Sequence, residues 1–155
     1  RHGKSDWDAI YDRDHDRPLS KRGLKASKKM GQYLNTIHQV PEIVVSSSAI
    51  RTKNTAKLAI KHGNWSSKFF IENEIYGGTS ETLLNIIHST EDKYGSICLV
   101  GHEPTCSSFI SLCTYHSQRF TTASMAKINF KTNSWGKIEF GKGILEWVKS
   151  PKEIT

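Results

Sequence analysis

The sequence contains few of the features that cross-link a chain or anchor it in a membrane. It has three cysteines, Cys98, Cys106 and Cys113, and no C-x-x-C pair. Because three cysteines cannot all pair within one chain, we predict reduced, mostly buried thiols in a reducing compartment, the cytoplasm. No apolar run approaches the ~18 residues that a membrane span needs, so we expect no membrane association.

The chain also lacks internal repeats, low-complexity tracts and a recognisable linker between domains. Its 155 residues, with a hydrophobic content of 36%, are enough to bury one sizeable core without cross-links. We therefore predict a single domain over residues 1–155.

Acidic residues are fewer than basic ones, with 15 Asp and Glu against 22 Lys and Arg, which leaves a net charge of +7. This excess favours anionic partners. The longest stretch that is basic and free of acids, residues 17–29, is predicted to be a solvated helix face. Since no basic and aromatic residues alternate as they do in single-strand binders, we expect no nucleic-acid partner.

Helical and strand patterns alternate along the chain. A helix is predicted from an N-cap at Ser20 to about Asn35, with Leu24 and Met30 on its apolar stripe. The other predicted elements are strands at 42–45, 69–71 and 97–100, helices after the serine-rich turn 46–48, from Ser80 and from Pro104, and a strand at 126–130 whose hairpin partner lies near Ile138 and Phe140.

This order predicts an α/β fold with three layers, in which helices flank a mostly parallel central sheet and a β-hairpin follows at the C-terminal end. The strand at 97–100 is an unbroken apolar run, so we expect it to be buried on both faces. A doubly wound sheet would also place an apolar strand directly before Arg1. We expect that first strand to lie outside this numbering.

Ligands bind at the carboxyl ends of the strands in open α/β sheets. Arg1 and His2 would follow the first strand, Arg51 follows the strand at 42–45, and His102 follows the strand at 97–100. Paired arginines supply bidentate donors for phosphoryl oxygens. Carboxylate or sulfate could be held in the same way, but two imidazoles favour phosphoryl transfer, in which one attacks phosphorus and the other donates to the oxygens.

The remaining histidines are explained by surface or capping positions, in polar loops or near helix ends: His15, His38, His62, His88 and His116. A zinc site made by His2, His102 and Glu74 is conceivable, but no H-E-x-x-H, C-x-x-C or short histidine spacing supports it. We therefore expect neither a metal nor a cofactor.

Four ordered motifs carry a resemblance to a known family. The chain resembles the histidine phosphatase superfamily, also called the phosphoglycerate mutase-like superfamily. The motifs that carry the resemblance are RHG at 1–3, DRPLSKRG at 16–23, VVSSSAIRTKNTA at 44–56 and LVGHEP at 99–104. Within this superfamily, the chain is most similar to the small SixA-type phosphohistidine phosphatases, which share the R-P-L-[ST]-x-x-G segment and a late F-T-T-[AS] stretch. The resemblance covers nearly the whole chain.

The resemblance implies roles for individual residues. His2 would be the nucleophile that becomes phosphorylated, and it would bind the phosphoryl oxygens together with Arg1, Arg51 and His102. Glu74 matches the position of the acid that protonates the leaving group, although Glu72 would point the same way on a strand-like backbone.

Substrate size is inferred from the 45 residues between Arg51 and Ile97, which leave no room for a long helical cover. An open pocket admits a phosphohistidine on a protein, such as a phosphotransfer domain, so we predict a metal-independent phosphohistidine phosphatase. The alternatives are a phosphomonoesterase for small metabolites and a phosphate-binding module without catalysis. Lys4, where several relatives have an acidic residue, would make the entrance more positive or project into solvent.

Overall fold

The fold alternates helices and strands along the chain, as the sequence pattern predicts. The computed structural model describes residues 1–154. Its longer elements are α1 (Lys21–Thr36), β1 (Ile43–Ser46), α2 (Ile50–His62), β2 (Lys68–Ile71), α3 (Ser80–His88), β3 (Ile97–Val100), α4 (Thr105–Thr114), β4 (Met125–Phe130) and β5 (Gly143–Lys149). Four 3-10 turns complete it: η1 (Asp14–Asp16), η2 (Asn73–Ile75), η3 (Trp135–Lys137) and η4 (Pro151–Glu153).

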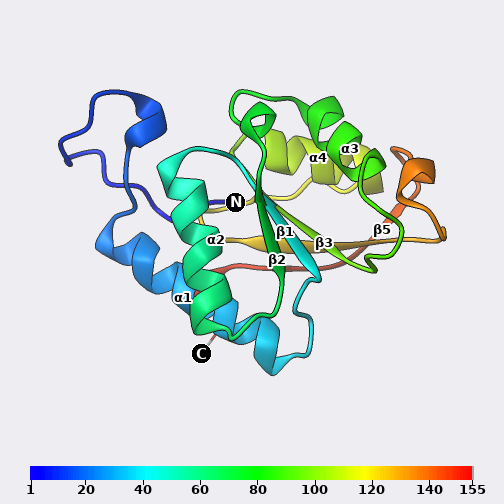
Figure 1. Ribbon diagram of the computed structural model, residues 1–155, viewed down its shortest axis with the longest axis horizontal. Helices are drawn as coiled ribbons and strands as arrows, with labels where there is room; N and C mark the ends of the chain where they lie inside the picture. The colour runs from blue at the N-terminus through cyan, green and yellow to red at the C-terminus, as the bar shows by residue number, and fades with distance from the viewer. Residues whose placement is uncertain (155) are drawn as a thin grey trace.

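The central sheet is parallel and lies between two pairs of helices. Its strand order is β2-β1-β3, while β4 and β5 form an antiparallel hairpin. Figure 1 shows α1 and α2 together on one side of the strands and α3 and α4 on the other. The predicted three-layer α/β fold with a C-terminal hairpin is confirmed.

The alternation of side chains along β1 builds the two cores. Ile43 and Val45 pack in the core that includes α3 and α4, whereas Val44 packs in the core that includes α1 and α2. Because successive side chains on a strand point to opposite faces, one short apolar strand holds both helical layers. The carboxyl ends of β1 and β3 are thereby fixed side by side.

Helix α1 begins where its N-cap is predicted, since the Ser20 hydroxyl accepts a hydrogen bond from the Gly23 amide at 3.1 Å. The predicted apolar stripe is wrong at Leu24, which is 38% exposed, while Gly23 is buried in its place. A Cβ atom on Gly23 would lie 2.1 Å from the Lys4 carbonyl oxygen. The absence of a side chain lets the segment after His2 lie directly against α1.

The hairpin has a different second strand from the one predicted near Ile138 and Phe140. These two residues lie in the connection before β5, where Ile138 is 2% exposed within the core and the Phe140 ring packs edge-on to Phe109. Their apolar side chains cover the core from the connection. An alternating apolar pattern alone could not distinguish this covering turn from a strand.

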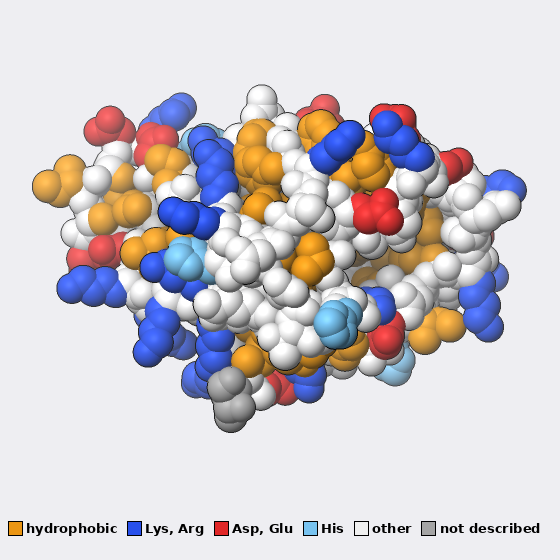
Figure 2. All heavy atoms as spheres, turned by 60° about the horizontal axis from the view of Figure 1, so that its bottom comes forward, with side chains coloured by type: hydrophobic (Ala, Val, Ile, Leu, Met, Phe, Trp, Pro, Cys, Tyr) orange, Lys and Arg blue, Asp and Glu red, His pale blue; other side chains and the backbone are white. Residues whose placement is uncertain are grey.

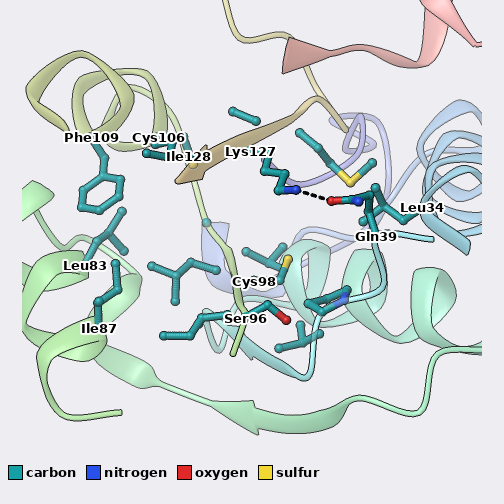
Figure 3. A pocket seen from close by; sticks show the side chains of 18 of the residues that line it. Leu34, Gln39, Leu83, Ile87, Ser96, Cys98, Cys106, Phe109, Lys127 and Ile128 are labelled. Atoms are coloured by element: carbon teal, nitrogen blue, oxygen red, sulfur yellow. Dashed lines mark hydrogen bonds between the residues drawn. The ribbon is translucent and has the colours of Figure 1, made fainter. Parts of the chain in front are cut away.

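A cavity of about 750 Å³ separates β3 from β4. Figure 3 shows Leu83, Ile87 and Phe109 on one side of it and Leu34 and Gln39 on the other. Three of the four β3 residues are half-buried because their free edge borders this cavity, so the predicted burial of β3 on both faces is wrong for them. The strand expected before Arg1 stays a prediction.

Basic side chains are spread over the surface. Figure 2 shows Lys and Arg side chains on both sides of the face that it displays, with Asp and Glu among them. Within residues 1–154, no helix is both long and apolar enough to span a membrane.

Candidate active site

The backbone of His2 is anchored at the carboxyl end of β3. Its amide donates to the Gly101 carbonyl at 3.2 Å, and its carbonyl accepts from the Ala123 amide at 2.9 Å. The next amide, of Gly3, donates to the Thr55 hydroxyl of α2 at 2.9 Å. The start of the chain is therefore held between β3, α2 and the loop before β4, and His2 is only 7% exposed.

One ring nitrogen of His2 is free to react. Nδ1 lies 2.7 Å from the Gly3 carbonyl oxygen. Since a carbonyl can only accept, Nδ1 carries the proton of the neutral ring and Nε2 keeps its lone pair. Nε2 makes no hydrogen bond within the described residues.

The charge state of His2 also suits a nucleophile. Burial, helped by the positive charge of Arg51, lowers the pKa of His2 to about 3 despite the opposing hydrogen bond to Gly3. Desolvation and a nearby cation both disfavour the imidazolium form. His2 is therefore neutral at pH 7.

His102 lies beside His2, with 5.4 Å between the ring centroids. Its Nε2 is 2.8 Å from the Ser47 hydroxyl, which comes from the turn after β1. Its Nδ1 is buried and has no hydrogen-bond partner in the part of the chain that the structure describes. Burial, followed by the charge of Arg51, lowers the pKa of His102 to about 4.

Arg51 extends from the first turn of α2 and is 5% exposed. Its Nη1 and Nη2 donate to the backbone oxygen and the carboxylate of Asp14, at 2.8 and 3.0 Å. Its Nε is buried without a partner in residues 1–154. A guanidinium held at one edge in this way keeps a further donor available for an anion.

Asp14 joins three groups at the edge of the site. Its carboxylate accepts from Arg51, from Arg17 Nη1 and from the Tyr76 hydroxyl, the last at 2.8 Å. Although burial opposes the shift, the Tyr76 hydrogen bond and the charge of Arg51 lower the pKa of Asp14 to about 2. Asp14 is therefore an anion that holds both arginines at neutral pH.

Arg17 belongs to this network and is missing from the sequence prediction of the site. The basic stretch that starts with it is predicted to be a solvated face, but Arg17 is 5% exposed. Its Nε donates to the Ser5 hydroxyl at 2.9 Å, and its guanidinium lies 3.5 Å from the centroid of the Trp7 ring. The sequence signal that could have indicated its burial is its place in DRPLS, a motif that matches the family. No role is predicted for Arg17 within that motif.

Arg1 lies at the opposite edge of the site. Its Nη1 donates to the Phe120 carbonyl at 3.0 Å, and its Nε is buried and unpartnered within the described residues. Only four buried side-chain nitrogen or oxygen atoms in residues 1–154 lack a partner. They belong to Arg1, His15, Arg51 and His102, so three of the four are on predicted site residues.

Glu74 does not join this cluster. It is exposed in the turn η2, and its carboxylate forms no ion pair among the residues described. Glu72 has an extended backbone but Glu74 does not, so the two side chains are not related as they would be on a strand. The same loop instead places the Tyr76 ring 5.5 Å from the ring centroid of His102.

The described residues contain no group of three or more His, Cys, Asp or Glu side chains that could hold a metal ion. The conceivable zinc ligands His2, His102 and Glu74 thus do not form such a cluster. The site instead has two neutral imidazoles, the guanidinium groups of Arg17 and Arg51 and one carboxylate. Arrangements of this kind bind and polarise a phosphoryl group.

Comparisons with known proteins relate this chain to one family. Residues 1–74 match the histidine phosphatase superfamily (branch 1). An uncharacterized chloroplastic protein of Arabidopsis thaliana is 32% identical over 145 residues, which cover 87% of this chain and 66% of that protein. The chain thus spans just under two thirds of the length of this plant relative.

Solved structures share the fold. The protein histidine phosphatase SixA complexed with tungstate superposes with a TM-score of 0.83 at 23% identity, over 98% of this chain and 94% of that one. A mycobacterial glucosyl-3-phosphoglycerate phosphatase superposes with a TM-score of 0.67 at 14% identity, over 94% of this chain and 93% of that one. The match thus assigns residues 1–74 to the histidine phosphatase superfamily, and the chain as a whole shares the fold of these phosphatase structures.

Proposed function

We propose that this chain hydrolyses phosphohistidine in a substrate protein through a phosphorylated His2. One observation carries the proposal: the His2 ring, whose Nε2 is free, lies 5.4 Å from the His102 ring, and the positive charge of Arg51 acts on both rings. A nucleophile next to donors that lack an acceptor fits a phosphoryl group that supplies both phosphorus and oxygens.

In the first step, the lone pair of His2 Nε2 attacks phosphorus in line with the bond that breaks. The substrate imidazole, protonated on its second ring nitrogen, leaves as neutral imidazole and takes the electrons of its P–N bond. Phosphorylated His2 carries a positive charge, and its Nδ1–H donates to the Gly3 carbonyl. This hydrogen bond is already formed in the free protein.

In the second step, water attacks phosphorus and the P–Nε2 bond breaks. The electron pair returns to Nε2, the water releases a proton to solvent and inorganic phosphate departs. We propose that Arg1, Arg51 and His102 hold the phosphoryl oxygens in both steps, and we add Arg17 because it shares the Asp14 carboxylate with Arg51. These donors supply the charge stabilisation, so the proposed mechanism needs no metal.

The substrate preference follows from the exposed position of the proposed acid. Imidazole has a conjugate acid of pKa ~6.5, whereas the alkoxide from an ester resembles hydroxide, whose conjugate acid has pKa ~15.7. Phosphohistidine therefore needs far less help from an acid. Glu74, or its neighbour Glu72, has a secondary role as proton donor in this proposal.

The test is to trap the intermediate. We expect 32P from a phosphohistidine peptide to appear on the wild-type protein but not on His2→Ala. The kcat of His2→Ala should also be at least 10³-fold lower than that of the wild type. His116→Ala is the matched control, because His116 is exposed and has no predicted role. Labelling of His2→Ala equal to the wild type would overturn the role of His2.

Substrate class is tested separately with small phosphoesters. We expect kcat/KM for the phosphohistidine peptide to exceed that for small esters by at least tenfold. The reverse ranking would make the chain a phosphomonoesterase for small metabolites. Saturable phosphate binding with no turnover of either substrate would make it a binding module.

A further inference from the structure

A second cleft, of about 450 Å³, opens on the side of Arg1 away from the Asp14 network. It is lined by Arg1, Lys4, Arg22, Glu103 and the loop 118–122, which includes Arg119. Arg22 comes from the first turn of α1 and Glu103 directly follows His102. Segments from four parts of the chain thus bring four cations and one carboxylate together.

The cations of this cleft are not neutralised by the protein. Within residues 1–154, none of Arg1, Lys4, Arg22 and Arg119 has a carboxylate oxygen within 4.0 Å. The one carboxylate of the cleft is engaged by α4, because Glu103 accepts from the amide and the hydroxyl of Ser107, both at 2.7 Å. Four positive charges less one negative charge leave three.

The start of α1 adds to this positive charge. Its first turn carries Lys21 and Arg22 and no acidic residue. The N-terminal end of a helix is already positive, so cations there are unfavourable unless an anion lies nearby.

The cleft is next to the proposed phosphate site. Arg1 precedes His2 and Glu103 follows His102, so both clefts border the same two backbone segments. Consecutive Cα atoms are 3.8 Å apart, and an extended chain advances by about 3.3 Å per residue. A peptide with its phosphohistidine at His2 therefore reaches this cleft with side chains one to three residues away.

We infer that this cleft is a subsite for carboxylates that flank the phosphohistidine of an acidic substrate segment. The inference rests on the proposed function and names the substrate class that it would favour. Lys4, Arg22 and Arg119 are all exposed and line an open cleft. Such mobile surface cations suit carboxylates spread along an extended peptide, because a single phosphate is more often held by backbone amides and buried arginines.

The test compares two peptides with the same phosphohistidine, one flanked by glutamates and the other by glutamines. At low salt we expect the wild type to have a kcat/KM about tenfold higher for the acidic peptide, from two or more contacts of the size of exposed ion pairs. Arg22→Gln/Arg119→Gln should lose this preference and change the neutral peptide less than twofold. Added salt should reduce the preference in the wild type.

The matched control is Lys137→Gln/Lys142→Gln, which removes the same charge from exposed residues near the C-terminal hairpin. It should keep the preference, and a loss as large as that in the cleft variant would show a general charge effect and overturn the subsite. Equal kcat/KM for both peptides in the wild type would also overturn it, while turnover itself would leave the proposed function standing.

If neither peptide is hydrolysed, the proposed function fails and the subsite is tested by binding alone. Titration with the unphosphorylated acidic peptide should then give a Kd about tenfold weaker in the cleft variant than in the control. Equal Kd values would overturn the inference.

Discussion

The site around His2 and the cleft lined by Arg1 are both cationic, but they hold their cations differently. Arg17 and Arg51 are 5% exposed and are fixed by Asp14. Lys4, Arg22 and Arg119 are exposed and have no carboxylate partner within the described residues. Phosphoryl transfer needs donors at fixed positions, whereas recognition of a flexible acidic segment needs only charge at short range.

The largest effect is expected from a variant that keeps the positive charge but removes the planar guanidinium group. Arg51→Lys retains the cation but loses the two contacts to Asp14 and the free Nε, so we expect kcat/KM to fall 10²- to 10³-fold. The same change in the cleft, Arg119→Lys, should cost less than twofold. Steady-state kinetics on one phosphohistidine peptide would show whether the two arginines differ, and similar losses would contradict the comparison.

Asp14→Asn tests whether fixed donors matter for turnover as well as for binding. Removing the carboxylate frees Arg17 and Arg51 for the phosphate but loosens their orientation, so we expect kcat to fall about tenfold while inorganic phosphate inhibits at lower concentration. Asp16→Asn is the control, because Asp16 pairs with the exposed Arg13. An unchanged kcat in Asp14→Asn would remove Asp14 from the positioning network.

The pH dependence of stability sharpens the contrast, because only the pocket contains buried titratable rings. The pKa values of His2 and His102 are lowered to about 3 and about 4, against 6.5 in the unfolded chain. Between pH 6.5 and these values the unfolded state binds more protons than the folded state does. The contribution of the two rings to the free energy of unfolding is therefore fully present above pH 6.5 and is lost as the pH falls. We expect Tm to decrease by several degrees from pH 7 to pH 4.

The Tm of the variant His2→Gln/His102→Gln should decrease less than that of the wild type between pH 7 and pH 4, because the variant lacks the two rings. Differential scanning calorimetry on both proteins gives the comparison. An equally steep decrease in the variant would assign the acid sensitivity to other groups.

Trp7→Ala is expected to have the smallest effect. The Trp7 ring is 62% exposed and packs on the Arg17 guanidinium, a contact of about 0.5–1 kcal/mol at exposed sites. We expect kcat/KM to fall about twofold and Tm to fall by 1–3 °C. A tenfold loss of kcat/KM would mean that Trp7 contacts the substrate directly.

Most of the framework could be predicted from local patterns. The Ser20 cap, β3 at 97–100 and the position of Arg51 early in α2 agree with the prediction, because capping and apolar runs depend on neighbours in the chain. The juxtaposition of His2 and His102 also follows from the rule on strand ends. The errors lie where distant segments decide, as at Leu24, which is exposed because Gly23 meets the backbone of Lys4.

The site shows the same division. Glu74 is predicted from its place in a motif, yet the 3-10 turn η2 leaves it exposed and brings Tyr76 to Asp14 instead. Arg17 is predicted to belong to a solvated basic stretch, yet it contacts Ser5, Trp7 and Asp14. For neither Glu74 nor Arg17 do the neighbouring residues in the sequence indicate where the side chain lies.

The amino-acid sequence alone determined the order of helices and strands, the three-layer fold and the closeness of His2 and His102. Side-chain period and capping are properties of consecutive residues, so they can be read without coordinates. Only the tertiary structure decided which cations are fixed by Asp14 and which remain free around the cleft. That difference depends on burial and on distant partners such as Arg51 and Tyr76, which are 37 and 62 residues from Asp14 along the chain. Both exist only once the chain has folded.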